Sequence, residues 1–354
     1  MLNNFQRGWS AINLEMTDKV PRTEYSTGYH KALISKVTGV PLKDLENSEA
    51  YNNANKEFMK RWEFTFMWNT LIGGGIFGDK KAFMGHAEYA EKGADKDNHI
   101  GSYFEDVEDI YKIDFEDLYG VPDKTEWKNQ FERHYKNAVD YYPDAVNMTG
   151  VYVTCISGLI EIFGWEMLLL GAGYDPVKFG HLTNRYNSWI LHYFEDLAAS
   201  NVPVVMVHDD IVWTQGPFIS PEWYRKYVFP HYKKIFTLLK EHGKKIIFTS
   251  DGNYNEFIDD LVACGVDGFV LEPLTDMQYI ANKYGNTHSF IGNADTRILL
   301  YGTKDDIFKE VKRCMDIGKK YPGFFLAVGN HIPANTPVDS CLYYNDFYEK
   351  LSKR

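Results

Sequence analysis

Short apolar runs alternate with longer amphipathic stretches along most of this chain. In the second half, runs rich in β-branched and aromatic residues occupy 201–210, 244–252, 268–273, 287–295 and 324–332. Stretches with apolar residues at helical spacing follow them, at 220–243, 255–265, 275–285, 303–321 and 339–352. Strands and helices that alternate in this order predict a parallel sheet with crossover helices.

Residues that start and stop helices support these boundaries. Ser220 suits an N-cap, Pro221 suits the first helical position, and Gly243 suits the end of the same helix. Gly265 closes the next helix, and Thr303 begins a later one. The pattern therefore predicts five strand–helix units in succession.

The first half is less regular, with strands predicted at 19–26, 62–69 and 147–157 and helices at 27–38, 158–171 and 176–199. Three strands and five make eight, the number that closes an α/β fold of the (β/α)8 TIM barrel type. We expect one barrel domain over residues 1–354, with an N-terminal extension and a long insertion, 70–146, near the barrel mouth. The rival is a doubly wound sheet, which normally has a glycine-rich phosphate loop after its first strand, and YSTGYH is not one.

The composition limits the kinds of molecule that this chain is expected to bind. The 354 residues carry a formal net charge of −11, which disfavours nucleic acid because phosphate binding requires a basic face. Aromatic residues make up 16% of the chain, compatible with a large core or with a deep pocket for a planar ligand. No signal peptide, membrane span or CxxC pair is visible, so we expect a cytoplasmic protein with reduced thiols and no membrane partner.

Most of the predicted strands end in polar or ionisable residues, although the strands themselves are apolar. In a (β/α) barrel the C-terminal ends of the strands meet at one face, where active sites lie. Several like charges at one opening need a cation, a proton or a substrate to compensate them. The strand-end residues are Glu24, Trp68, Asn69, Thr154, His208, Asp209, Asp210, Ser250, Asp251, Glu272, Asn293, Asp295, Asn330 and His331.

Asp251, Glu272 and His331 form the first candidate group. Two carboxylates and one imidazole match the ligands of a catalytic Zn²⁺, or of another divalent metal, with one position left open. A hydrogen-bonded polar cluster without metal is the alternative.

His208 and Asp210 form the second candidate group. Strand alternation sends these two side chains to one face and Asp209 to the other. Facing inward, His208 and Asp210 would act as acid and base or orient a substrate, whereas Asp210 would otherwise cap the loop that follows. His86, in the insertion, is either a substrate-binding residue above the mouth or a solvated loop histidine.

Three segments resemble the uroporphyrinogen decarboxylase-like superfamily. They are VMVHDDIVWTQGPFISPEWYRKYVFPHYKKI at 205–235, IIFTSDGNYNEFIDDLVACGVDGFVLEP at 246–273 and FLAVGNHIPANTP at 325–337. The resemblance extends from about 147 to 337 and implies a (β/α) barrel, in agreement with the strand count. It does not specify a substrate.

Two branches of this superfamily imply different chemistry. The decarboxylases carry an arginine-rich N-terminal signature that pairs with substrate carboxylates, whereas KVPRTEYSTGYHK here has a single arginine, Arg22. The corrinoid-dependent methyltransferases hold zinc through a His-x-Cys and a distant Cys. Those positions read Thr249-Ser250-Asp251 and Asn330 here, so a zinc ion without thiolate ligands would be a harder Lewis acid.

The resemblance implies a methyltransferase that moves a methyl group from a small donor, such as a methoxylated aromatic, to a corrinoid carried by a separate protein. Trp68, Tyr152 and Trp213 would line the donor pocket with Asn330, and His208 or Asp210 would protonate the leaving group. A decarboxylase or lyase acting on a small carboxylated substrate is the alternative enzyme. A binding protein without catalysis is the third possibility.

Overall fold

The fold is built around a curved parallel sheet. The computed structural model describes residues 2–83, 87–90, 93–96 and 101–354. Six strands pair in the order β12-β11-β10-β9-β6-β5, every pair parallel. They are β5 (Thr149–Val151), β6 (Val204–His208), β9 (Lys245–Thr249), β10 (Gly268–Leu271), β11 (Ser289–Gly292) and β12 (Phe324–Phe325).

Two further segments complete the ring. β1 (Phe66–Met67) lies parallel to β4 (Val146–Asn147), which leads directly into β5. Arg22 forms parallel bridges to Phe64 on one side and to Leu326 on the other. The Thr65 amide donates to the Arg22 carbonyl (2.9 Å), and the Leu326 amide donates to the Pro21 carbonyl (2.9 Å). These contacts join the two edges, so the predicted eight-stranded (β/α) barrel is confirmed.

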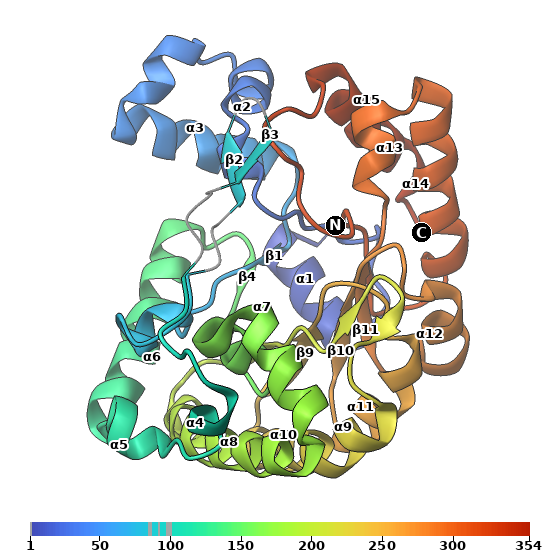
Figure 1. Cartoon of the computed structure of the whole chain (residues 1–354). Helices are drawn as coiled ribbons and strands as arrows, with labels where there is room; N and C mark the ends of the chain where they lie inside the picture. Colours follow the sequence, from blue (N-terminus) through green and yellow to red (C-terminus); the bar gives the residue numbers. More distant parts are fainter. Residues whose placement is uncertain (1, 84–86, 91–92, 97–100) are drawn as a thin grey trace.

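Helices surround the strands (Figure 1). A crossover helix follows each strand of the ring, and shorter elements lie between some of these strands and their helices. The crossover helices are α3 (Ser48–Arg61), α6 (Lys124–Tyr141), α8 (Pro176–Ala199), α10 (Phe229–Glu241), α11 (Ile258–Cys264), α12 (Met277–Tyr284), α14 (Lys304–Gly318) and α15 (Val338–Leu351).

The remaining elements extend the barrel at its ends and edges. The helices are α1 (Asn4–Ile12), α2 (Lys31–Thr38), α4 (Val107–Ile110), α5 (Phe115–Tyr119), α7 (Ser157–Tyr174), α9 (Pro221–Tyr227) and α13 (Thr296–Tyr301). Two antiparallel hairpins are formed by β2 (Ala87–Ala90) with β3 (Gly93–Lys96) and by β7 (Val212–Trp213) with β8 (Gly216–Pro217). Short 3-10 turns cover Thr27–Tyr29, Leu42–Glu46, Gly74–Phe77 and Asn255–Phe257.

Two sequence-based boundaries differ from the structure. The segment 70–146 is not only loops: it includes α6, the crossover helix between the second and third strands of the ring. Only Phe131 of α6 is buried, so its apolar stripe is too thin to recognise. The helix predicted at 220–243 is divided into α9 and α10 at Val228, because Pro230 lacks the amide that a continuous helix would need there.

The interior of the barrel is an apolar layer that alternates along each strand. Val204 and Met206 of β6, Ile247 of β9 and Val270 of β10 belong to one inward-facing cluster. Side chains at even separations along a strand point the same way, and His208 and Glu272 follow Met206 and Val270 by two residues, whereas Asp251 follows Ile247 by four. His208, Asp251 and Glu272 therefore lie above this layer, at the C-terminal ends of the strands. Within the described part of the chain, no helix is long and apolar enough to cross a membrane.

Candidate active site

His208 is held rigidly at the end of β6. Its ring stacks on the ring of Tyr152, with the centroids 3.7 Å apart and the planes 6° from parallel. Its Nδ1 donates a hydrogen bond to the Tyr152 carbonyl (2.8 Å), because a carbonyl oxygen only accepts. The ring therefore presents Nε2 to the barrel mouth, as an acceptor when the imidazole is neutral and as a second donor when it is protonated.

Asp210 faces that nitrogen. Its Oδ1 lies 3.4 Å from His208 Nε2. With Nδ1–H already used, a neutral ring and an ionised carboxylate would point lone pairs at each other. The contact becomes favourable when one proton lies between them, on Nε2 or on the carboxyl group. His208 and Asp210 thus form a pair suited to hold and release one proton.

Asp251 adds a second carboxylate to this pair. Its backbone amide donates to Asp210 Oδ1 (3.0 Å), so the two acidic residues lie side by side at the ends of neighbouring strands. Burial and the negative charges of Asp210 and Glu272 raise the pKa of Asp251 to about 7, while His208 and Asn330 oppose the shift. The group can therefore store a proton at neutral pH, as a general acid must.

Glu272 is fixed by two donors. The Gly252 amide donates to Oε2 (2.7 Å), and the Asn330 side-chain amide donates to Oε1 (2.5 Å). Gly252 has φ +86°, and a Cβ there would lie 2.8 Å from the Trp213 carbonyl oxygen, so the turn requires glycine. We name His208, Asp210, Asp251, Glu272 and Asn330 the acid cluster.

His331 lies outside the acid cluster. Its Nδ1 is 2.5 Å from the hydroxyl of Ser26, and its ring meets the edge of Tyr25 with 6.4 Å between centroids. Burial lowers the pKa of His331, so the imidazole is neutral at physiological pH. Ser26 has φ +55°, a left-handed conformation that is strained for a non-glycine residue and common at ligand sites.

A cavity of about 590 Å³ opens beside the acid cluster. Tyr25 and Trp68 form a stacked pair in its wall, with ring centroids 4.5 Å apart. Tyr152 belongs both to this wall and to the stack on His208. The remaining lining residues are Glu24, Ser26, Thr27, Gly28, Tyr29, Asn55, Met59, Phe64, Met67, Asn69, Thr70, Met206 and His331. None of the acid cluster residues is part of this lining, and Tyr152 is the contact between the cavity wall and His208.

The predicted metal ligands are not assembled in this conformation. Among the residues that the structure describes, no group of three or more His, Cys, Asp or Glu side chains is placed to hold a metal ion. Both oxygens of Glu272 accept hydrogen bonds from protein amides, and His331 is engaged with Ser26. The described arrangement does not fit the predicted set of Asp251, Glu272 and His331, and a zinc site stays a prediction.

Other predicted residues lie at different places. Trp213 is 45% exposed on the β7–β8 hairpin and packs against Trp165 and Phe218 rather than lining the cavity. Asp209 faces the helix layer, where it accepts hydrogen bonds from the Ile156 and Ser157 amides and from Tyr232. His86 lies outside the described residues.

Sequence reasoning missed the contribution of the first strand. Tyr25 and Ser26 follow Glu24 directly, so the polar strand end at Glu24 was the available signal. The side chain of Glu24 itself is buried, pairing with Arg22 (2.9 Å) and accepting from the Val328 amide (3.0 Å). The next two residues, rather than Glu24, present their side chains to the open part of the cavity.

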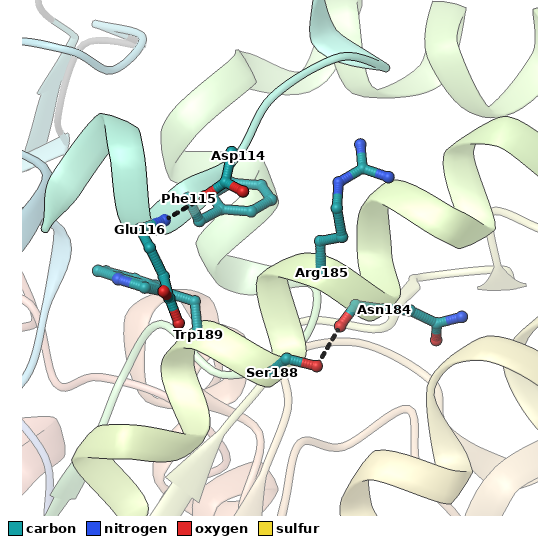
Figure 2. A pocket seen from close by; sticks show the side chains of 7 residues that line it. All are labelled: Asp114, Phe115, Glu116, Asn184, Arg185, Ser188 and Trp189. Carbon is teal, nitrogen blue, oxygen red and sulfur yellow. Dashed lines mark hydrogen bonds between the residues drawn. The ribbon is translucent and has the colours of Figure 1, made fainter. Parts of the chain in front are cut away.

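A second hollow lies on the outside of the barrel. A groove of about 400 Å³ lies between α5 and α8. Figure 2 shows the side chains that line it, among them Asp114, Glu116, Arg185 and Ser188. Arg185 donates to the carbonyls of Ile113 and Tyr111, so it holds the α5 segment on α8. None of these residues belongs to the acid cluster, and the groove has a structural explanation.

Comparison with known proteins identifies relatives over part or all of the chain. The family described as uroporphyrinogen decarboxylase matches residues 163–350. The uroporphyrinogen decarboxylase of Carboxydothermus hydrogenoformans is 28% identical over 177 residues, 50% of this chain and 49% of that protein. The enzyme of Thermus thermophilus is 25% identical over 171 residues, 48% of each protein. The chain thus spans about half the length of these curated relatives.

A solved structure is similar over the whole chain. A methyltransferase from Methanosarcina mazei superposes with a TM-score of 0.67, covering 99% of both chains at 16% sequence identity. At this identity the likeness shows the fold. It extends the barrel assignment to the first half of the chain, where the family match is absent.

Proposed function

This chain belongs to the uroporphyrinogen decarboxylase family, and from that premise we propose that it transfers a methyl group from a methoxylated aromatic donor to a corrinoid protein. The observation that carries the proposal is the 3.4 Å contact between His208 Nε2 and Asp210 Oδ1, next to Tyr152 in the wall of an aromatic cavity, because this contact becomes favourable when one proton lies between the two side chains. The methyltransferase name of the Methanosarcina structure supports the same class of reaction.

The proposed chemistry requires a proton for the departing oxygen. The bond between the methyl carbon and the ether oxygen breaks, and its electron pair stays on the oxygen. The pair formed by His208 and Asp210 donates the proton that converts this oxygen to a phenol. When bound on its partner, the corrinoid supplies the reduced cobalt that accepts the methyl group.

The other groups of the site position and recharge this proton donor. Tyr152 fixes the plane of His208 by stacking and fixes its tautomer through the carbonyl. Asp251 shares the proton-holding role, since its pKa of about 7 allows it to be protonated before each turnover. The sequence also predicts metal assistance by a divalent ion on Asp251, Glu272 and His331, which is tested by elemental analysis of the purified protein.

The test is a methyl-transfer assay with purified protein, a methoxylated phenol and free cob(I)alamin in place of the partner. We expect methylcobalamin to form, which is followed by its visible absorption spectrum. The demethylated phenol should form in equal amount. His208→Gln removes the proton donor and should slow transfer by roughly 10²–10⁴-fold. His231→Gln is the matched control, because His231 lies on α10 and contacts Asn184 instead of the cluster.

A decarboxylase is the second candidate, favoured by the raised pKa of Asp251. There the bond to the carboxylate carbon would break, CO2 would leave, and the remaining carbon would take the proton. Arg22 could not pair with a substrate carboxylate, since it is fully buried against Glu24 and Asn345. Release of CO2 without methylcobalamin formation would replace the first proposal by this one.

A further inference from the structure

We propose that the cavity beside the acid cluster selects planar donors that carry no negative charge. This inference rests on the proposed function, because it names the donor class of the same site. It excludes the methoxylated benzoates and favours methoxylated phenols and amines.

The shape and chemistry of the walls favour a flat ring. Tyr25 and Trp68 stack with their planes 28° apart, and Tyr152 is 42% exposed where it borders the cavity. Met67 and Met206 add polarisable thioethers that pack well against aromatic rings. An aromatic donor can therefore bury both its faces and its edge.

The charge of the surroundings opposes an anion. Among the described residues that line the cavity, none is Lys or Arg, and the one charged side chain is Glu24. Burial and the negative charges of Glu24, Asp251 and Glu272 raise the pKa of the Tyr25 hydroxyl in the cavity wall, and Asp210 lies beside Asp251, so these carboxylates are close to the cavity. A donor carboxylate would lose its hydration without gaining a cation, and it would be repelled by these groups.

The polar groups of the wall suit uncharged oxygens. Ser26 and His331 form one polar pair in the lining. The Asn69 side-chain amide is a further uncharged polar group of the lining, and an ether or hydroxyl oxygen can accept a hydrogen bond from an amide or a hydroxyl. The wall therefore offers neutral hydrogen bonds rather than ionic ones.

The experiment compares three donors on the full-length protein without corrinoid, by titration calorimetry and by quenching of tryptophan fluorescence. Guaiacol is neutral, vanillylamine is cationic, and vanillate carries one carboxylate. We expect vanillate to bind at least roughly tenfold more weakly than guaiacol, with vanillylamine at least as tight as guaiacol. Equal or tighter binding of vanillate overturns the proposal, and so does the absence of binding by all three.

A substitution in the cavity lining provides a second test, in which the protein is changed instead of the ligand. Thr70→Arg places a cation in the lining, where Thr70 is half-buried. Vanillate affinity should then rise by roughly tenfold, with guaiacol changed much less. Ser188→Arg, in the outer groove of Figure 2, is the matched control and should leave both affinities unchanged. An equal gain in the control, or no gain in Thr70→Arg, would count against the inference.

Binding and turnover separate this inference from the proposed function. If the donors bind in the expected order but no methylcobalamin forms, the selectivity stands and the methyl-transfer proposal fails. If methyl transfer proceeds equally well from vanillate and guaiacol, the function stands and the selectivity fails.

Discussion

At the scale of single residues, the main feature of the site is that acidic side chains are concentrated around one imidazole. Asp210 accepts the Asp251 amide and lies 3.4 Å from His208 Nε2. The pKa of Asp251 is raised to about 7 by burial and by the negative charges of Asp210 and Glu272.

Asp251→Asn is predicted to be more stable than the natural protein at alkaline pH. The folded pKa of Asp251 is raised to about 7 from 3.8, so its stabilising contribution is present below about pH 4 and is lost as the pH rises through 7. Water at the barrel mouth screens part of the electrostatic interaction, which reduces the expected change in stability. Thermal unfolding should show a midpoint higher by about 1–2 °C at pH 8 and no gain at pH 4.

The same variant should change the pH profile of catalysis. Removing one negative charge makes the remaining groups release their proton more easily. The alkaline limb of kcat/KM, expected near pH 7 in the natural protein, should move to lower pH in Asp251→Asn. A limb that stays in place would mean that Asp251 does not influence the catalytic proton.

The inward direction of His208, Asp251 and Glu272 could be predicted because strand alternation continues to the strand ends. The position of His331 could not. β12 is only two residues long, isolated bridges extend the pairing to Val328, and from Gly329 the chain bends, so strand alternation no longer applies at His331. The hydrogen bond to Ser26 joins residues 305 positions apart, a contact that no local pattern reveals.

At the scale of elements, the turn after β9 organises the site. Its Gly252 amide holds Glu272, and its left-handed backbone brings the turn against the β7–β8 hairpin, where the Asn253 amide donates to the Trp213 carbonyl (3.0 Å). One turn therefore fixes both a carboxylate and the neighbouring hairpin.

Gly252→Ala is predicted to destabilise the protein and to reduce activity. An alanine there must adopt φ near +86° and crowd the Trp213 carbonyl, so the free energy of unfolding should fall by about 1–2 kcal/mol. Urea denaturation measures this loss. Gly75→Ala is the control, because a Cβ at Gly75 meets nothing within 4 Å, and it should stay within about 0.5 kcal/mol.

The helices that the sequence did not reveal have thin or interrupted apolar stripes. In α3, only Ala54, Phe58 and Met59 are buried, and α6 buries Phe131 alone. Both helices cover the side of the barrel where strand pairing is shortest. Hydrophobic periodicity is a weak guide to such helices, because the tertiary contacts that stabilise them involve few side chains.

At the scale of the whole molecule, closure of the barrel depends on Arg22. Its guanidinium is fully buried, pairs with Glu24 and Asn345, and lies over the rings of Trp62, Tyr344 and Tyr348. The residue therefore ties the first strand to the last helix. Arg22, the single arginine of the segment 19–31, therefore has a structural role in place of substrate binding.

Arg22→Met is predicted to be severely destabilised. It leaves Glu24 buried without its cation, a change that typically costs about 3–5 kcal/mol in the free energy of unfolding. The double variant Arg22→Met/Glu24→Gln should recover part of this loss, because the amide carries no charge. Chemical denaturation of both variants checks the order, and a double variant less stable than the single one would contradict the pairing.

Within each strand, different positions serve stability and chemistry, and this separation has an evolutionary consequence. Met206, Ile247 and Val270 belong to the apolar layer inside the barrel, while His208, Asp251 and Glu272, two or four positions later, lie at its mouth. Exchanges at 251, 272 or 330 leave the apolar layer untouched. Single substitutions can therefore replace one set of reactive groups by another while every intermediate protein still folds. New catalytic activities can arise in this way on the same barrel.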